Sequence, residues 1–76
     1  MEEMSQILFM KTRIARLASE KWNIPIDKIA AIFRKYDVFE YIEKGFGIFH
    51  CEGDDAVFYD VSDYLKRKGF INDDNI

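Results

Sequence analysis

His50 and Cys51 place a base beside a nucleophile in the sequence. Thiol chemistry needs such a pair, provided that the imidazole lies within hydrogen-bond reach of the sulfur. The surrounding residues favour a β-strand, however, and neighbouring side chains of a strand point to opposite faces. We therefore expect a carboxylate such as Asp54 or Asp60 to pair with His50, and Cys51 to pack as a small apolar residue. No catalytic residue is assigned, and the chain is not expected to be an enzyme.

Three acids surround Gly53 and suggest a cation-binding loop. Glu52, Asp54 and Asp55 lack the regular acidic spacing and the distal glutamate of a calcium loop. A solvated, charged hairpin tip that prevents edge pairing explains them better. We expect no metal site and no cofactor.

Phe9 and Lys11 interrupt the apolar pattern of the first expected helix. At about 100° per residue, the arc through Ile14 contains Lys11 and is widened by Leu8, whereas Phe9 lies nearly opposite, beside two arginines. An aromatic side chain flanked by arginines is typical of a protein interface. The candidate partner contacts are Phe9, Lys11, Arg13 and Arg16.

Two interpretations of these residues stay open. In the first, Phe9 is an ordinary exposed aromatic or lies beneath Phe70 and Ile71, and the Lys11 stem follows the core with its ammonium in water. In the second, one helix face packs on the domain and the other binds a partner chain, with Phe9 as the anchor and the arginines as its rim. A small domain gains stability from such an interface.

Helical spacing predicts two helices in the first half of the chain. The first covers residues 5–22, which contain no Gly or Pro. The second covers residues 25–36 and is opened by Pro25, whose fixed φ suits a first helical turn. Ile26 is expected in its buried stripe.

A third, short helix is expected to begin at Val38. Asp37 and Glu40 have the spacing of a capping box, which marks a helix start. Lys44 and Gly45 supply a cationic last turn followed by a residue suited to the left-handed conformation. We expect the helix to end there.

The remaining residues predict a β-hairpin and a last helix. Residues 46–51 and 56–59 are short aromatic and β-branched runs on either side of a Gly-containing loop. Asp60 and Asp63 repeat the cap spacing and are expected to open the helix, which Gly69 ends.

These elements predict an α+β fold that is mainly helical, in the order helix, helix, short helix, β-hairpin, helix. Seventy-six residues suffice for one small domain. We therefore assign residues 1–76 to a single domain, with an ordered core over residues 5–71. A chain of this length buries only about 60% of its unfolded surface, so marginal stability is expected.

Charge and cysteine usage limit the partners and the compartment. The net charge is −3, but residues 11–35 hold seven bases against two acids, and the acidic hairpin offers a complementary patch. A single cysteine excludes an internal disulfide and fits a reducing compartment. No apolar run reaches the roughly 20 residues of a membrane span. We expect a cytoplasmic protein without a membrane partner.

Three blocks of the sequence resemble a family of small uncharacterised bacterial proteins, a domain of unknown function. The blocks are residues 33–42, residues 48–53 with His50 before an acidic Gly loop, and residues 60–66, which open with an aspartate. Some members are encoded beside proteins similar to ADP-ribosyltransferases. The resemblance implies an antitoxin-like or accessory role and assigns no catalytic residue.

We expect a non-enzymatic interaction module that binds another protein or itself. The alternative is a winged-helix-like regulator that binds nucleic acid through the basic segment 11–35. A recognition helix starting at Val38 would present Glu40 and Glu43 to phosphate, and the wing would be acidic too. The charges therefore disfavour direct duplex binding.

Overall fold

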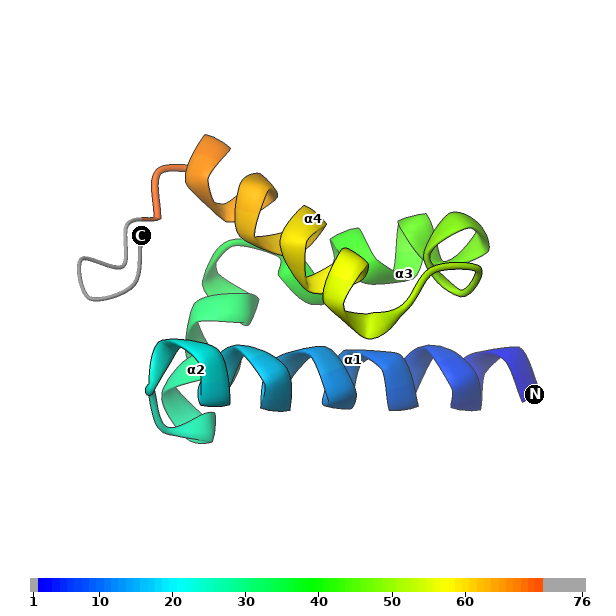
Figure 1. The fold of residues 1–76 in the computed structure, drawn as a ribbon, viewed down its shortest axis with the longest axis horizontal. Coiled ribbons are helices and arrows are strands. Elements are labelled where there is room, and N and C mark those ends of the chain that lie inside the picture. Colours follow the sequence, from blue (N-terminus) through cyan, green and yellow to red (C-terminus); the bar gives the residue numbers. More distant parts are fainter. Residues whose placement is uncertain (1, 71–76) are drawn as a thin grey trace.

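The computed structural model describes residues 2–70, which form four helices joined by short loops (Figure 1). The helices are α1 (Glu2–Trp22), α2 (Ile26–Lys35), α3 (Val38–Phe49) and α4 (Asp54–Arg67). Each of the last three packs against α1, and α3 also packs against α2 and α4. In Figure 1, α2 lies beside the C-terminal end of α1, whereas α3 and α4 lie along its side.

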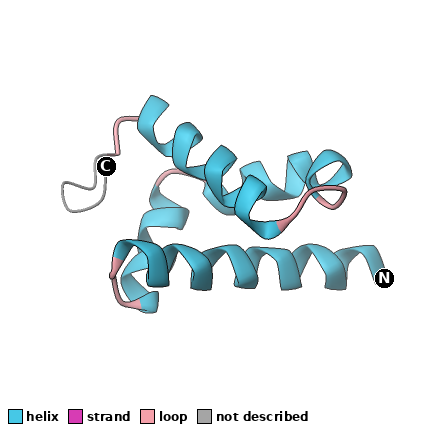
Figure 2. Cartoon of the chain, in the orientation of Figure 1, coloured by secondary structure: helices cyan, strands magenta, loops and turns pink. Residues whose placement is uncertain are grey.

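The expected α+β fold is wrong, because no strand is found between residues 2 and 70 (Figure 2). Residues 46–51 form the end of α3 and the turn that follows it, and residues 56–59 lie inside α4. The predicted helix start at Asp60 is wrong too. Instead, α4 begins after Gly53, whose backbone is extended, and has Asp54 in its first turn.

Apolar residues on both sides of the loop between α3 and α4 keep a helical period, which explains why these segments form helices and not a hairpin. They recur at intervals of three or four and therefore share one face of each helix. Burying both stripes against α1 outweighs the strand preference of aromatic and β-branched residues, which depends strongly on context. The buried residues are Val38, Ile42, Phe46 and Phe49 in α3, and Val57, Val61 and Leu65 in α4.

Gly45 does not end α3, contrary to the expectation. The ring of Phe49, one turn later, lies directly over it, and a Cβ at position 45 would come within 2.5 Å of the nearest ring carbon. Helical side chains lean toward the N-terminus, so a residue covers the turn before its own. The glycine therefore makes room for a buried aromatic ring.

Gly69 ends the last helix as expected. Its φ is +100°, which favours glycine. Its N–H donates to the Lys66 carbonyl at 3.1 Å, and the Phe70 N–H donates to the Leu65 carbonyl at 2.9 Å. These two bonds form a Schellman motif. The motif turns Phe70 back toward Trp22, with ring centroids 5.8 Å apart.

The core is one cluster of side chains from all four helices. Trp22 closes one end, because its ring also contacts Phe58 with centroids 5.2 Å apart. Phe70 packs against this cluster, whereas Ile71 lies outside the described residues. The most deeply buried large side chains are Phe33, Ile14, Ile29, Ile42 and Leu65.

Alanine substitutions at two glycines of α3 should have opposite effects. Gly45→Ala forces the buried Phe49 ring to move, and we expect a loss of about 1–2 kcal/mol in the free energy of unfolding. Gly47→Ala meets no neighbouring atom among the described residues, so its better helix propensity should add about 0.5–1 kcal/mol. Urea denaturation followed by circular dichroism measures both. Equal effects would contradict the packing role of Gly45.

Tyr41 should make the fold sensitive to alkaline pH. Burial raises the pKa of its phenol above the ordinary value, and the nearby charge of Asp60 raises it further, although Arg67 opposes the shift. The unfolded chain therefore loses this proton first, so the free energy of unfolding falls as the pH rises above about 10. In Tyr41→Phe, which keeps a ring to stack on Tyr64, that decline should be shallower. Urea titrations between pH 8 and pH 11 test the difference, and identical slopes would contradict it.

Candidate functional site

The outward face of α1 carries three of the four predicted contact residues, and Lys11 is the exception. Phe9 is 60% exposed, and Arg13 and Arg16 are exposed beside it. The alternative that Phe70 covers Phe9 is wrong, because Phe70 packs against Trp22 at the other end of α1. Phe9 therefore belongs to the open surface of the helix.

Three further apolar residues are exposed near this face, and sequence reasoning missed them. Leu8 is 60% exposed and Ile26 is 48% exposed, although both were expected in buried stripes, and Met4 is also exposed. Leu8 lies about 120° around the helix from Ile14, which is fully buried. That wide angle was the one signal in the sequence that Leu8 lies at the edge of the core.

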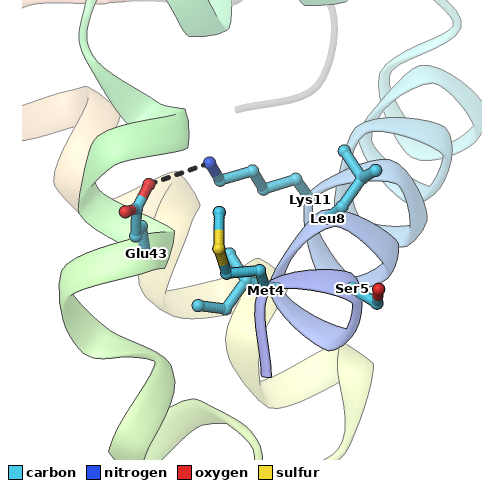
Figure 3. Close-up of a pocket in the computed structure, with 6 residues that line it drawn as sticks. Met4, Ser5, Leu8, Lys11 and Glu43 are labelled. Atoms are coloured by element: carbon cyan, nitrogen blue, oxygen red, sulfur yellow. Dashed lines mark hydrogen bonds and ion pairs between the residues drawn. The ribbon is translucent and has the colours of Figure 1, made fainter. Parts of the chain in front are cut away.

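A trough runs along α1 beside these residues. One part, of about 480 Å³, has walls from α1, from the start of α2 and from Phe39 of α3. A second part, of about 350 Å³, lies toward the N-terminal end of α1 (Figure 3). Both parts include Leu8 and Lys11, so we treat them as one surface, the α1 trough. It is lined by Met4, Ser5, Ile7, Leu8, Lys11, Thr12, Ala15, Arg16, Ile26, Phe39 and Glu43.

Lys11 crosses the trough. Its Nζ lies 3.1 Å from Oε1 of Glu43 on α3, and Figure 3 shows the side chain extended over Met4 toward that carboxylate. The Lys11 side chain is mostly covered, and its ammonium is held by a carboxylate that is 59% exposed. An ion pair this exposed contributes little to stability, so the bridge can open at low cost.

Arg13 and Arg16 differ in their partners. Nε of Arg13 lies 3.0 Å from Oδ2 of Asp54, which ties α1 to the first turn of α4. The acidic residues around Gly53, which were expected to complement the bases of residues 11–35, thus do so partly within the chain. Arg16 makes no ion pair with any residue between 2 and 70. It is therefore the cation of this face that stays available to a partner.

The hydroxyl of Thr12 is occupied within its own helix. Its Oγ1 donates to the carbonyl of Leu8 at 3.0 Å. A threonine bonded in this way satisfies its polar atom along the helix axis. Thr12 therefore adds no unpaired donor to the surface between Leu8 and Arg16.

His50 and Cys51 lie closer together than expected. Because they occupy a turn and not a strand, Sγ of Cys51 is 3.7 Å from Nε2 of His50. Nδ1 of His50 lies 2.8 Å from the carbonyl oxygen of Phe46. A carbonyl only accepts, so Nδ1 carries the proton in this bond and Nε2 faces the sulfur.

The environment of this pair also differs from the expectation. His50 bonds to a backbone carbonyl, and neither Asp54 nor Asp60 is its partner in residues 2–70. Cys51 is exposed and does not pack in the core. Within the described part of the chain, no three His, Cys, Asp or Glu side chains gather closely enough to hold a metal ion.

The structure also bears on nucleic-acid and membrane partners. The winged-helix alternative required a β-hairpin as its wing, and the described residues contain no strand. Its recognition helix would be α3, which exposes Glu40 and Glu43. None of the helices described here is both long and apolar enough to cross a bilayer.

Comparison with known proteins identifies one family. A family model described as "Protein of unknown function (DUF3791)" matches residues 9–68. The match begins at Phe9 and includes Lys11, Arg13 and Arg16. Neither the curated proteins nor the solved structures gave a match.

The exposure of Cys51 can be tested with a thiol reagent. We expect Ellman's reagent to modify one thiol per chain in native buffer, at a rate within roughly tenfold of that in urea, since no unfolding is needed. Absorbance at 412 nm follows the reaction. A thiol that reacts only after denaturant is added would contradict the exposed turn and restore the buried position first expected.

Proposed function

The chain belongs to the DUF3791 family of proteins of unknown function, and we propose that it is a non-enzymatic module that binds another protein through the outward face of α1. The observation that carries the proposal is the exposure of Leu8 and Phe9 on consecutive positions of one helix, each 60% accessible. Single exposed apolar residues are normal on a protein surface, whereas a continuous apolar strip marks an interaction site.

The composition of this face supports the proposal. Leu8, Phe9, Arg13 and Arg16 line one hollow on this face, and all of them are exposed. Aromatic residues and arginine are enriched in interfaces, where an apolar centre is surrounded by a polar rim. Lys11 lies about 160° around α1 from Phe9, so it is outside this face and reaches Glu43 of α3 instead.

The resemblance to small bacterial proteins encoded beside ADP-ribosyltransferase-like proteins suggests the biological setting. In that setting the partner is the product of a neighbouring gene, and the chain has an accessory or antitoxin-like role. Cytoplasmic location is part of the same proposal. Association with a second copy is the competing form of protein binding.

Purification of the full chain from its own cell tests the proposal. We expect a companion protein to copurify with the wild type and to be lost with Phe9→Ser, because the substitution removes the apolar anchor. The matched control is Tyr59→Ser, which alters an aromatic on α4 that is 76% exposed. Mass spectrometry identifies the companion in each preparation.

Stability measurements keep this experiment interpretable. Both substitutions are at exposed positions, so each should change the free energy of unfolding by no more than about 0.5 kcal/mol. A folded Phe9→Ser chain that retains the companion as well as Tyr59→Ser does would overturn the assignment of this face. A wild-type chain that purifies as a lone monomer would overturn protein binding itself.

A further inference from the structure

We propose that the α1 trough binds an amphipathic helix of the partner whose polar side is acidic. The proposal rests on the proposed function, since the trough adjoins the outward face of α1 and shares Leu8 and Arg16 with it, whereas Phe9 lies outside the trough lining. It specifies the shape, the length and the charge of the segment that binds there. Each follows from a different feature of the trough.

The trough has the dimensions of a helix-binding groove. It extends along α1 from Met4 to Arg16, which at 1.5 Å per residue is about 18 Å. A helix of about 12 residues, or three to four turns, covers that distance. Amphipathic helices commonly bind by laying their apolar face into such grooves.

The lining supplies apolar contacts on both walls. Leu8 and Ala15 come from α1, Phe39 comes from α3, and Ile26 of α2 lies toward one end. The Thr12 hydroxyl donates to the Leu8 carbonyl within α1, so this donor needs no polar group from the incoming helix. Apolar side chains repeating every three or four residues on the incoming helix would bury these surfaces.

The charges favour an acidic polar side. Arg16 lines the trough and has no ion-pair partner between residues 2 and 70. Lys11 lines it as well, and within residues 2–70 its one ion-pair partner is the exposed Glu43. A carboxylate on the partner can pair with Arg16 directly and can replace Glu43 on Lys11.

The same charges argue against a second copy as the occupant. An interface between two identical α1 troughs would join two surfaces whose charged lining, Lys11, Arg16 and Glu43, is net positive. Like charges brought together at an interface cost free energy and suppress that pairing. A partner that differs in sequence and carries acids avoids the repulsion.

Fluorescence anisotropy with designed peptides provides the test. The probe is a labelled 16-residue amphipathic helix with leucines on one side and glutamates on the other. Two matched peptides replace the glutamates by lysines or the leucines by serines. We expect the acidic peptide to bind the full chain at least tenfold more tightly than either matched peptide at low salt, and to weaken as salt is added.

Charge-matched variants of the chain locate the peptide. Arg16→Glu should weaken binding at least fivefold, whereas Lys66→Glu, an equal charge change on the exposed side of α4, should not. Glu43→Gln frees Lys11 and should tighten binding more than Glu40→Gln does. Glu40 lies on the same helix and pairs with Lys44 at 3.7 Å, away from the trough.

Equal binding of the acidic and lysine peptides would overturn the inference, as would equal effects of the two glutamine variants. A chain that doubles its mass by sedimentation, with Arg16→Glu altering that mass, would assign the trough to a second copy instead. Binding to anionic phosphatidylglycerol vesicles without binding to the acidic peptide would assign it to a lipid surface. Either result would also overturn the inference.

The peptide result is separable from the proposed function. If a companion depends on Phe9 but the acidic peptide does not bind, protein binding stands and the acidic helix is wrong. If the peptide fails and no companion depends on Phe9, both proposals fall.

Discussion

The packing of three helices onto α1 is the constraint on which the rest of the structure depends. Ile14 and Ala18 have no exposed surface, and Ala15 is nearly as buried. Two alanines among these three positions let neighbouring helices approach closely, since the distance between helix axes depends on the side chains at the contact. All of the short chain's core is organised along one side of this helix.

That arrangement also leaves a surface uncovered. With 10 residues, α2 spans less than half the length of the 21-residue α1, and it lies beside its C-terminal end (Figure 1). The N-terminal half of α1 therefore keeps Leu8 and Phe9 in the open. The trough is thus a consequence of unequal helix lengths, and the charges of Lys11 and Arg16 give it a preference for acidic partners.

The sequence was sufficient for the first half of the fold and insufficient for the second. Helical spacing and Pro25 place α1 and α2 within three residues of their ends, and Gly69 ends the last helix as expected. The role of Gly45 was predicted wrongly, because a glycine can either end a helix or make room for a neighbouring side chain. The position of the Phe49 ring shows that the second role applies. A helix that ends at Gly45 leaves residues 46–51 and 56–59 as short aromatic and β-branched runs, a composition that favours a hairpin.

The candidate site divides in the same way. The exposure of Phe9, Arg13 and Arg16 followed from their place opposite the apolar arc, a property of α1 alone. The exposure of Leu8 and Ile26 depends on where α2 and α3 lie, which helical spacing does not encode. The contact between His50 and Cys51 was missed for the same reason as the hairpin, since a turn places neighbouring side chains together and a strand separates them.

Hydrogen–deuterium exchange of the chain, alone and with its copurified companion, tests the central claim most directly. The account predicts that the companion slows exchange in α1 between Met4 and Arg16 and at the start of α2, and leaves the outer side of α4 around Tyr59 unchanged. Protection confined to α4, with α1 exchanging as it does in the free chain, would contradict it.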